Sequence, residues 1–128
     1  MKKLLPVFIA ILLLNNLSAK ELTANLTSAA FSTPDNKTYV ETYLSIIGNS
    51  VQYVKNNNGK YQASVNILMS ISMNDSLKDF RRYILNSPET EDTLKAPNFL
   101  DLQRFTLPIG FYEMKITMFD VNRNPQRI

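Results

Sequence analysis

Apolar and polar residues alternate from Tyr61 to Met73, and this alternation constrains the fold more than any other feature of the sequence. Every second residue is apolar, and Leu68 is the single apolar residue among the polar set. A period of two gathers apolar side chains on one face of a β-strand, whereas a helix would scatter them around its surface. The segment therefore predicts a long strand with one buried face.

Other stretches repeat this pattern between turn residues. Phe111 to Phe119 alternates clearly, and Thr38 to Ile47 alternates more loosely. Several short strands separated by turns predict an all-β fold, an antiparallel Ig-like β-sandwich of about seven strands. The remaining strands are expected at Leu22 to Ser32, Val51 to Val54, Leu77 to Leu85 and Leu100 to Leu107.

One of these segments is ambiguous. Leu77 to Leu85 carries apolar residues at 77, 80, 84 and 85, a spacing that also fits a helix. Neighbouring strands and the Ser87-Pro88 pair that follows favour a strand. Ser87 to Asn98 is expected to form the longest exposed loop. Turns are expected at Pro34 to Asn36 and Asn74 to Ser76, and the Asn-Gly pair within Asn56 to Gly59 is typical of a hairpin.

The first residues are typical of an export signal. Lys2 and Lys3 precede an unbroken apolar run of eleven residues, Leu4 to Leu14. We expect cleavage after Ala19, with residues 1–19 as signal peptide and residues 20–128 as a single domain. An uncleaved anchor is the alternative, but a spanning helix needs about 20 apolar residues. The sequence thus predicts an exported protein, periplasmic, envelope-associated or secreted, with no stable membrane span after cleavage.

The amino-acid composition excludes several classes of catalytic and binding site. The chain has no His and no Cys, which excludes imidazole and thiolate metal ligands, disulfides, and His- or Cys-dependent nucleophilic catalysis. The formal net charge of +3 includes the two signal lysines. Arg81-Arg82 is the only adjacent basic pair after the signal, so nucleic-acid binding is not expected. We expect no enzyme activity, cofactor or metal.

The end of the sequence suggests a missing strand. Asp120 to Pro125 reads as a turn after the Tyr112–Phe119 strand, and the sequence stops at Ile128 without a returning partner. A strand without a neighbour exposes unpaired N–H and C=O groups. We expect the closing strand to come from the chain's own missing C-terminal region, if this is a fragment or the first module of a longer protein. The alternative is a complete protein whose edge accepts a partner's strand.

Two segments of the sequence resemble a known protein family, and this resemblance supports the expectation of a missing C-terminal region. They are Phe31-Ser-Thr-Pro-Asp-Asn-Lys-Thr-Tyr39-Val-Glu-Thr-Tyr-Leu-Ser45 and Leu107-Pro-Ile-Gly110-Phe-Tyr112, the latter followed by Met118-Phe-Asp120. Together with Phe99 to Phe105, they resemble the N-terminal β-sandwich region of the GWxTD-domain proteins, exported proteins of certain Gram-negative bacteria. The resemblance covers most of residues 22–122 and implies the first module only, because the chain has no Trp and lacks the Gly-Trp-x-Thr-Asp motif. It implies no catalytic residues.

Two groups of residues are candidates for a role. Tyr39, Glu41 and Tyr43 share one strand face and could bind a glycan or peptide, although aromatic residues also cover sheet faces structurally. Gly110 and Tyr112 are expected to form a structural corner, with the tyrosine hydroxyl bonded to backbone.

Acidic residues offer a weaker signal. Glu89, Glu91 and Asp92 could bind calcium, but their spacing matches no calcium loop, so a solvated turn is the simpler account. Asp120 and Asn122 are similarly explained by an Asx-turn. The sequence therefore predicts an exported, non-catalytic interaction or scaffold module of a larger envelope-associated protein. The alternative is a small secreted ligand-binding domain that uses the Tyr39/Tyr43 face or the Ser87–Asn98 loop.

Overall fold

The computed structural model describes residues 21–123, and the expected signal peptide, residues 1–19, lies outside them. The all-β prediction is confirmed. Two short 3₁₀-helices, η1 (Gly48–Ser50) and η2 (Thr93–Lys95), interrupt the strands. The strands are β1 (Ala24–Ser32), β2 (Lys37–Ile46), β3 (Val54–Lys55), β4 (Tyr61–Gln62), β5 (Ser64–Met73), β6 (Ser76–Asn86), β7 (Phe99–Pro108) and β8 (Glu113–Asp120).

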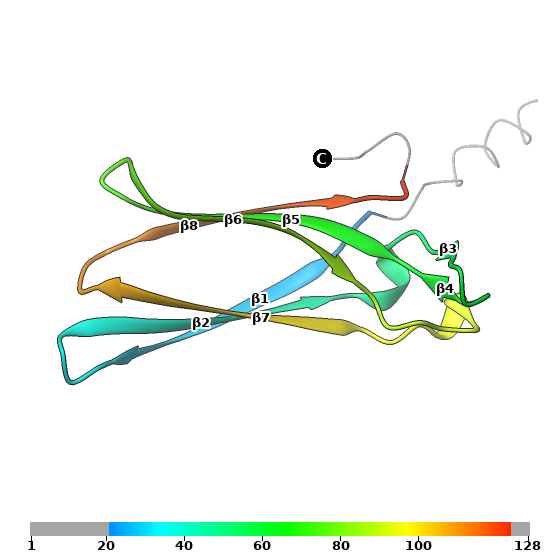
Figure 1. The fold of residues 1–128 in the computed structure, drawn as a ribbon, viewed down its shortest axis with the longest axis horizontal. Coiled ribbons are helices and arrows are strands. Elements are labelled where there is room, and N and C mark those ends of the chain that lie inside the picture. The colour runs from blue at the N-terminus through cyan, green and yellow to red at the C-terminus, as the bar shows by residue number, and fades with distance from the viewer. Residues whose placement is uncertain (1–20, 124–128) are drawn as a thin grey trace, which may run out of the picture.

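Six of the strands form two antiparallel sheets that lie face to face as two layers (Figure 1). One sheet has the order β1-β2-β7 and the other the order β6-β5-β8. The short hairpin of β3 and β4 lies at one end of the sandwich, beside η1 and η2 (Figure 1). Whether the fold is a member of the Ig-like group stays a prediction. No helix within residues 21–123 has the length and apolar character needed to cross a membrane.

The core is built from the alternating residues of the two central strands. From β2 come Leu44 and Ile46, and from β5 come Ile67 and Met69, all of them buried. Phe105 of β7 is also fully enclosed. Leu68, the exception in the alternation, points to the outer face because its neighbours across the sheet are Arg82 and Thr117. Burial of one face of each sheet thus follows the period of two.

The ambiguous segment is a strand: β6 spans Ser76–Asn86, and the helical alternative is wrong. The expected strand at Val51 to Val54 is wrong for most of its length, since only Val54 joins β3. Ser50 donates its N–H to the carbonyl of Ile47 (3.0 Å), which closes η1. Val51 then enters the core directly, with 7% of its surface exposed.

The long alternating segment is split in two at Ala63. Its N–H donates to Ser87 Oγ (2.9 Å), and its carbonyl accepts the N–H of Ser87 (2.9 Å). The side chain of Ser87 therefore replaces one bond of the ladder, and β4 ends before β5 begins.

The hairpin turns differ from the expected pattern. Asn74 and Asp75 both have positive φ angles, 49° and 64°, and they join Met73 and Ser76, which are paired across the hairpin. Two positive φ angles in a two-residue loop characterise a type I′ turn. In the Asn56–Gly59 turn, by contrast, Gly59 has a φ of 74° while Asn58 is not in the positive region. The tightest turn thus lacks a glycine.

Candidate functional site

β8 is an edge strand within the described residues, with β5 as its neighbour. Val121, just after β8, donates its N–H to the carbonyl of Ser64 (3.0 Å), and this bond fixes the phase of the antiparallel ladder. Because bonded pairs recur at every second residue, Lys115 and Thr117 turn their backbone groups toward β5. The N–H and C=O groups of Met114, Ile116 and Met118 point the other way, toward the outside of the sheet.

The inner face of β1, in the opposite sheet, is uncovered. Leu26, Ser28 and Ala30 lie on the same face as the buried residues of β2, because Leu26 pairs with Leu44 and Ser28 with Thr42. Leu44 is 2% exposed, whereas Leu26 is 48% exposed, and Ser28 and Ala30 are exposed as well. The sheet β6-β5-β8 therefore covers the inner face of β2 and leaves the inner face of β1 exposed to solvent. We call this region the open side; its residues are Leu26, Ser28, Ala30, Met114, Ile116 and Met118.

The end of the open side is held by a hydrogen-bonded turn. The carboxylate of Asp120, at the end of β8, accepts the N–H of Gln52 (2.8 Å) and of Asn122 (3.3 Å). The second of these bonds is that of an Asx-turn. Arg123 donates to the carbonyl of Ser50 (3.0 Å), and Ser50 Oγ accepts the N–H of Thr23 (3.0 Å). This chain of contacts joins the end of β8 to the start of β1.

The other side of the sandwich, between β6 and β7, is closed by polar side chains. Arg81 donates to Gln103 Oε1 (2.9 Å) and to the carbonyl of Arg104 (2.7 Å), and its guanidinium lies 3.9 Å from the centre of the Phe105 ring. Tyr83 donates to the carboxylate of Asp101. Burial, together with this bond, raises the pKa of the Tyr83 hydroxyl. We call this group the latched side.

The predicted Tyr39, Glu41 and Tyr43 lie on the outer face of β2. Tyr43 donates to the Glu41 carboxylate, which also lies 3.3 Å from Nε of Arg104 on β7. The hydrogen bond from Tyr43 and the charge of Arg104 hold the pKa of Glu41 below its usual range. A side-chain hydrogen bond from Tyr39 also lowers the pKa of Glu41, and the Tyr39 ring contacts Phe31, with ring centres 6.5 Å apart. The structure thus brings Tyr39, Glu41 and Tyr43 together, and the polar groups of this face are engaged with one another.

Gly110 and Tyr112 lie at the connection between β7 and β8. Tyr112 donates its hydroxyl to the carbonyl of Pro108. A Cβ atom on Gly110 would lie 2.4 Å from the Cε of Met73, so a side chain there would require the end of the Met73 side chain to move. Both residues therefore lie at the crossing from one sheet to the other, which the Tyr112 hydroxyl holds and which Figure 1 shows as the orange segment between the layers.

The acidic residues of the Ser87–Asn98 loop have separate partners. Glu89 accepts hydrogen bonds from Asn56 (3.1 Å) and Asn58 (3.2 Å), which lower its pKa. Glu91 pairs with Lys60 (3.4 Å), and Asp92 accepts the N–H of Leu94 at the start of η2 (3.0 Å). Across residues 21–123, no cluster of carboxylates has the arrangement of a metal site.

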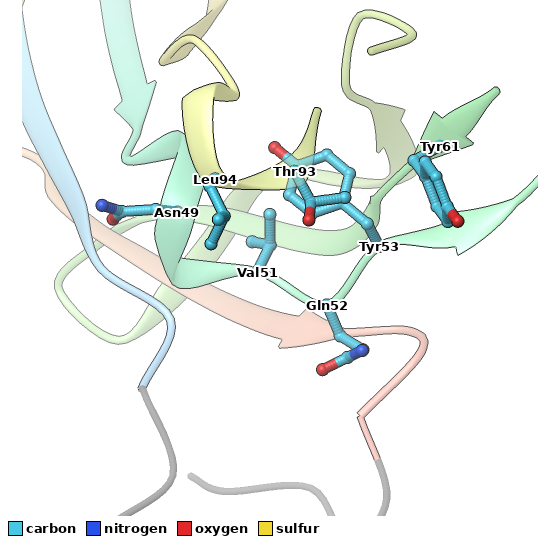
Figure 2. A pocket seen from close by; sticks show the side chains of 7 residues that line it. All are labelled: Asn49, Val51, Gln52, Tyr53, Tyr61, Thr93 and Leu94. Atoms are coloured by element: carbon cyan, nitrogen blue, oxygen red, sulfur yellow. The ribbon is translucent and has the colours of Figure 1, made fainter. Parts of the chain in front are cut away.

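A pocket of about 370 Å³ lies between this loop and the segment that follows η1 (Figure 2). Tyr53 crosses its middle and donates its hydroxyl to the carbonyl of Gly48 (2.7 Å). Burial raises the pKa of Tyr53. Tyr61 and Leu94 flank it at the surface, and Leu94 is 87% exposed. The lining residues are Asn49, Val51, Gln52, Tyr53, Tyr61, Thr93 and Leu94.

The sequence pointed to the Ser87–Asn98 loop, which contributes Thr93 and Leu94 to this pocket, but it did not point to the latched side. Arg81 and Gln103 are 22 residues apart, and nothing in their local patterns links them. The one available signal was the presence of charged residues at alternate positions of β6, where the inward face of a strand is normally apolar.

Comparisons with protein-family models, with curated proteins and with solved structures found no match for this chain. The function is therefore inferred from the residues and geometry of the chain itself.

Proposed function

We propose that this chain is an exported, non-catalytic β-sandwich module that binds other polypeptide by adding a strand to β8. The observation that carries the proposal is the open side. There, an edge strand presents its outward N–H and C=O groups beside the uncovered face of β1. Strand addition supplies main-chain hydrogen bonds at such an edge, and side-chain pockets give it specificity.

The export signal predicted at residues 1–19 and the resemblance to GWxTD-domain proteins support a place in the cell envelope. In this setting the module serves as an interaction or scaffold domain of a larger envelope-associated protein. The added strand comes from a partner or from a C-terminal continuation of the chain. A non-catalytic role is supported by the acidic side chains of the Ser87–Asn98 loop, each of which is engaged with its own partner.

Site-specific photo-crosslinking in the producing cells tests this proposal. A benzophenone amino acid replaces Lys115, beside the β8 edge, or Thr27, on the outer face of β1. We expect a crosslinked polypeptide from position 115 and none from position 27. Equal yields at both positions, or no adduct at position 115, would contradict strand addition at β8.

The pocket in Figure 2 favours a second candidate function, the binding of a small polar ligand such as a sugar. Two tyrosines line it, and aromatic faces beside amide groups are suited to sugar rings. A glycan array with the wild-type protein and with Tyr61→Ala tests this function. Binding that is lost in Tyr61→Ala would support it, and an array without signal would reject it.

A further inference from the structure

We infer that the segment bound by the open side is an extended strand of another protein. This strand has bulky apolar residues at alternate positions, and on its other face an acidic residue is followed two positions later by a basic one. This inference rests on the proposed strand addition and specifies the chemistry of the added strand. It follows from the size of the side chains on β1, from the charges on β8, and from the poor fit of a second copy.

The space to be filled determines the inward residues. The inner face of β1 carries mostly small side chains, Ser28 and Ala30, and only Leu26 is large. In the facing sheet, Met114, Ile116 and Met118 are half-buried at the margin of the core. A strand beside β8 would lie over these small residues. Large apolar side chains on its inward face would exclude water from both surfaces. Small side chains would leave both surfaces in contact with water.

The charges of β8 determine the outward residues. Glu113 and Lys115 point to the outer face and are exposed. On one face of a sheet, residues directly opposite one another interact, and opposite charges are favoured over like charges. An antiparallel strand would therefore place an acidic residue opposite Lys115 and, two residues later, a basic residue opposite Glu113.

A second copy of the chain fits this edge poorly. Pairing two β8 strands around Ile116 aligns their full length but sets Glu113 against Phe119 and Lys115 against Thr117. Pairing them around Met114 sets Glu113 against Lys115 but leaves Ile116 and the residues after it beyond the end of the partner's β8. Neither register both places opposite charges against each other and pairs β8 along its full length. A separate segment can do both.

Peptide binding to the full chain tests the inference. The probe is a blocked peptide, Lys-Ile-Thr-Ile-Thr-Ile-Glu-Ile-Lys, whose last three residues match the order required opposite Lys115, Met114 and Glu113. One control has Ala at every Ile position, and the other exchanges the Glu and the final Lys. Fluorescence anisotropy gives the affinities, and amide exchange reports protection of Met114, Ile116 and Met118.

Two matched variants locate the site. Ser28→Phe fills the space on the inner face of β1, whereas Thr27→Phe adds the same ring to the outer face of that strand. Ile116→Pro removes an outward N–H without breaking a bond to β5, and Ile116→Ala is its control for lost packing. We expect Ser28→Phe and Ile116→Pro to weaken binding at least about tenfold relative to their controls. Both control peptides should bind at least about tenfold more weakly than the probe.

The outcomes separate the two proposals. If the alanine or charge-exchanged peptide binds as tightly as the probe, or if Ser28→Phe has no effect, the inferred chemistry is wrong, while a crosslink at position 115 would still support strand addition. A wild-type chain that dimerises through protected β8 amides without peptide would overturn the inference in favour of a second copy. Absence of both peptide binding and the crosslink would overturn both proposals.

Discussion

At the level of single residues, Thr42 is unusual among the core residues. Its side chain is fully buried between the sheets, and its hydroxyl has no hydrogen-bond partner among the described residues. A buried polar group without a partner loses its bonds to water and gains nothing in return. Thr42 therefore reduces the stability of a core whose other members are almost all apolar.

Replacing Thr42 with Val should raise the free energy of unfolding by about 1 kcal/mol, because it keeps the shape and removes the unpaired hydroxyl. Urea denaturation monitored by circular dichroism measures the change. Thr38→Val, at a less buried position on the same face, serves as control and should have a smaller effect. A loss of stability in Thr42→Val would mean that the hydroxyl is hydrogen-bonded in solution.

Glu41 gives a second prediction at this scale. Its lowered pKa means that its carboxylate stabilises the folded state at neutral pH, and this contribution disappears as the pH falls through the folded-state pKa. Tyr43→Phe should raise the pKa of Glu41, because the hydrogen bond from Tyr43 is the largest cause of the shift. NMR titration of the carboxyl carbon measures it. Arg104→Gln should raise the pKa less, and the reverse order would contradict the assignment.

The sequence predicted which single residues face inward but could not predict which of them would meet. Tyr39, Glu41 and Tyr43 share a face because a strand has a period of two. The pairing of Glu41 with Arg104, however, depends on β7 lying beside β2, a neighbour 63 residues away along the chain. Local patterns contain no information about such partners.

Among the elements, the β5–β6 hairpin has the tightest connection, made by Asn74 and Asp75. The second position of a type I′ turn requires a positive φ, which costs a residue with a Cβ more than it costs glycine. The strands pair despite this cost, because the packing of β5 in the core fixes their position.

Asp75→Gly should therefore raise the free energy of unfolding by about 0.5–1 kcal/mol, since glycine adopts the angle without strain. Thermal and urea denaturation of the variant measure the gain. Asp35→Gly, in the β1–β2 turn, provides the matched control. Asp35 is not in the positive φ region and accepts a hydrogen bond from Thr33, so this change should lower stability. Destabilisation by both changes would contradict the assigned turn.

The strands were predictable wherever apolar and polar residues alternate or turn residues bound them. The prediction failed over most of Val51 to Val54, because the chain leaves η1 and buries Val51 in the core before Val54 joins β3. A short apolar segment can bury its side chains without joining a sheet, and periodicity over four residues cannot separate these outcomes.

On the scale of the whole molecule, the two sides of the sandwich differ. Arg81 and Tyr83 of β6 reach β7 and close the latched side with hydrogen bonds. On the open side, β8 and β1 meet through the turn at Asp120 and Arg123, and the face of β1 beyond it stays uncovered. The sequence predicted an edge at Tyr112–Phe119. The uncovered face of β1, however, depends on how the two layers overlap, and this overlap cannot be predicted from the residue pattern of any one strand.

Amide exchange should reveal this edge directly in the isolated protein. The N–H groups of Lys115 and Thr117 bond to β5 and should exchange slowly, whereas those of Ile116 and Met118 point outward and should exchange much faster. Two-dimensional NMR after transfer into D₂O measures each rate. Uniformly slow exchange along β8 would show that another strand already occupies the edge.

The turn that joins Arg123 to Ser50 also determines how the module would respond to mechanical force. The start of β1 and the end of β8 lie at the same end of the sandwich (Figure 1). A pull that separates these two points acts across the strands, so it would break the bonds of Arg123 and Thr23 first. It would then peel an edge strand, β1 from β2 or β8 from β5, one residue pair at a time. A module tethered at both points would therefore extend under low force, and it would release an edge strand of the open side while the latched side stayed intact.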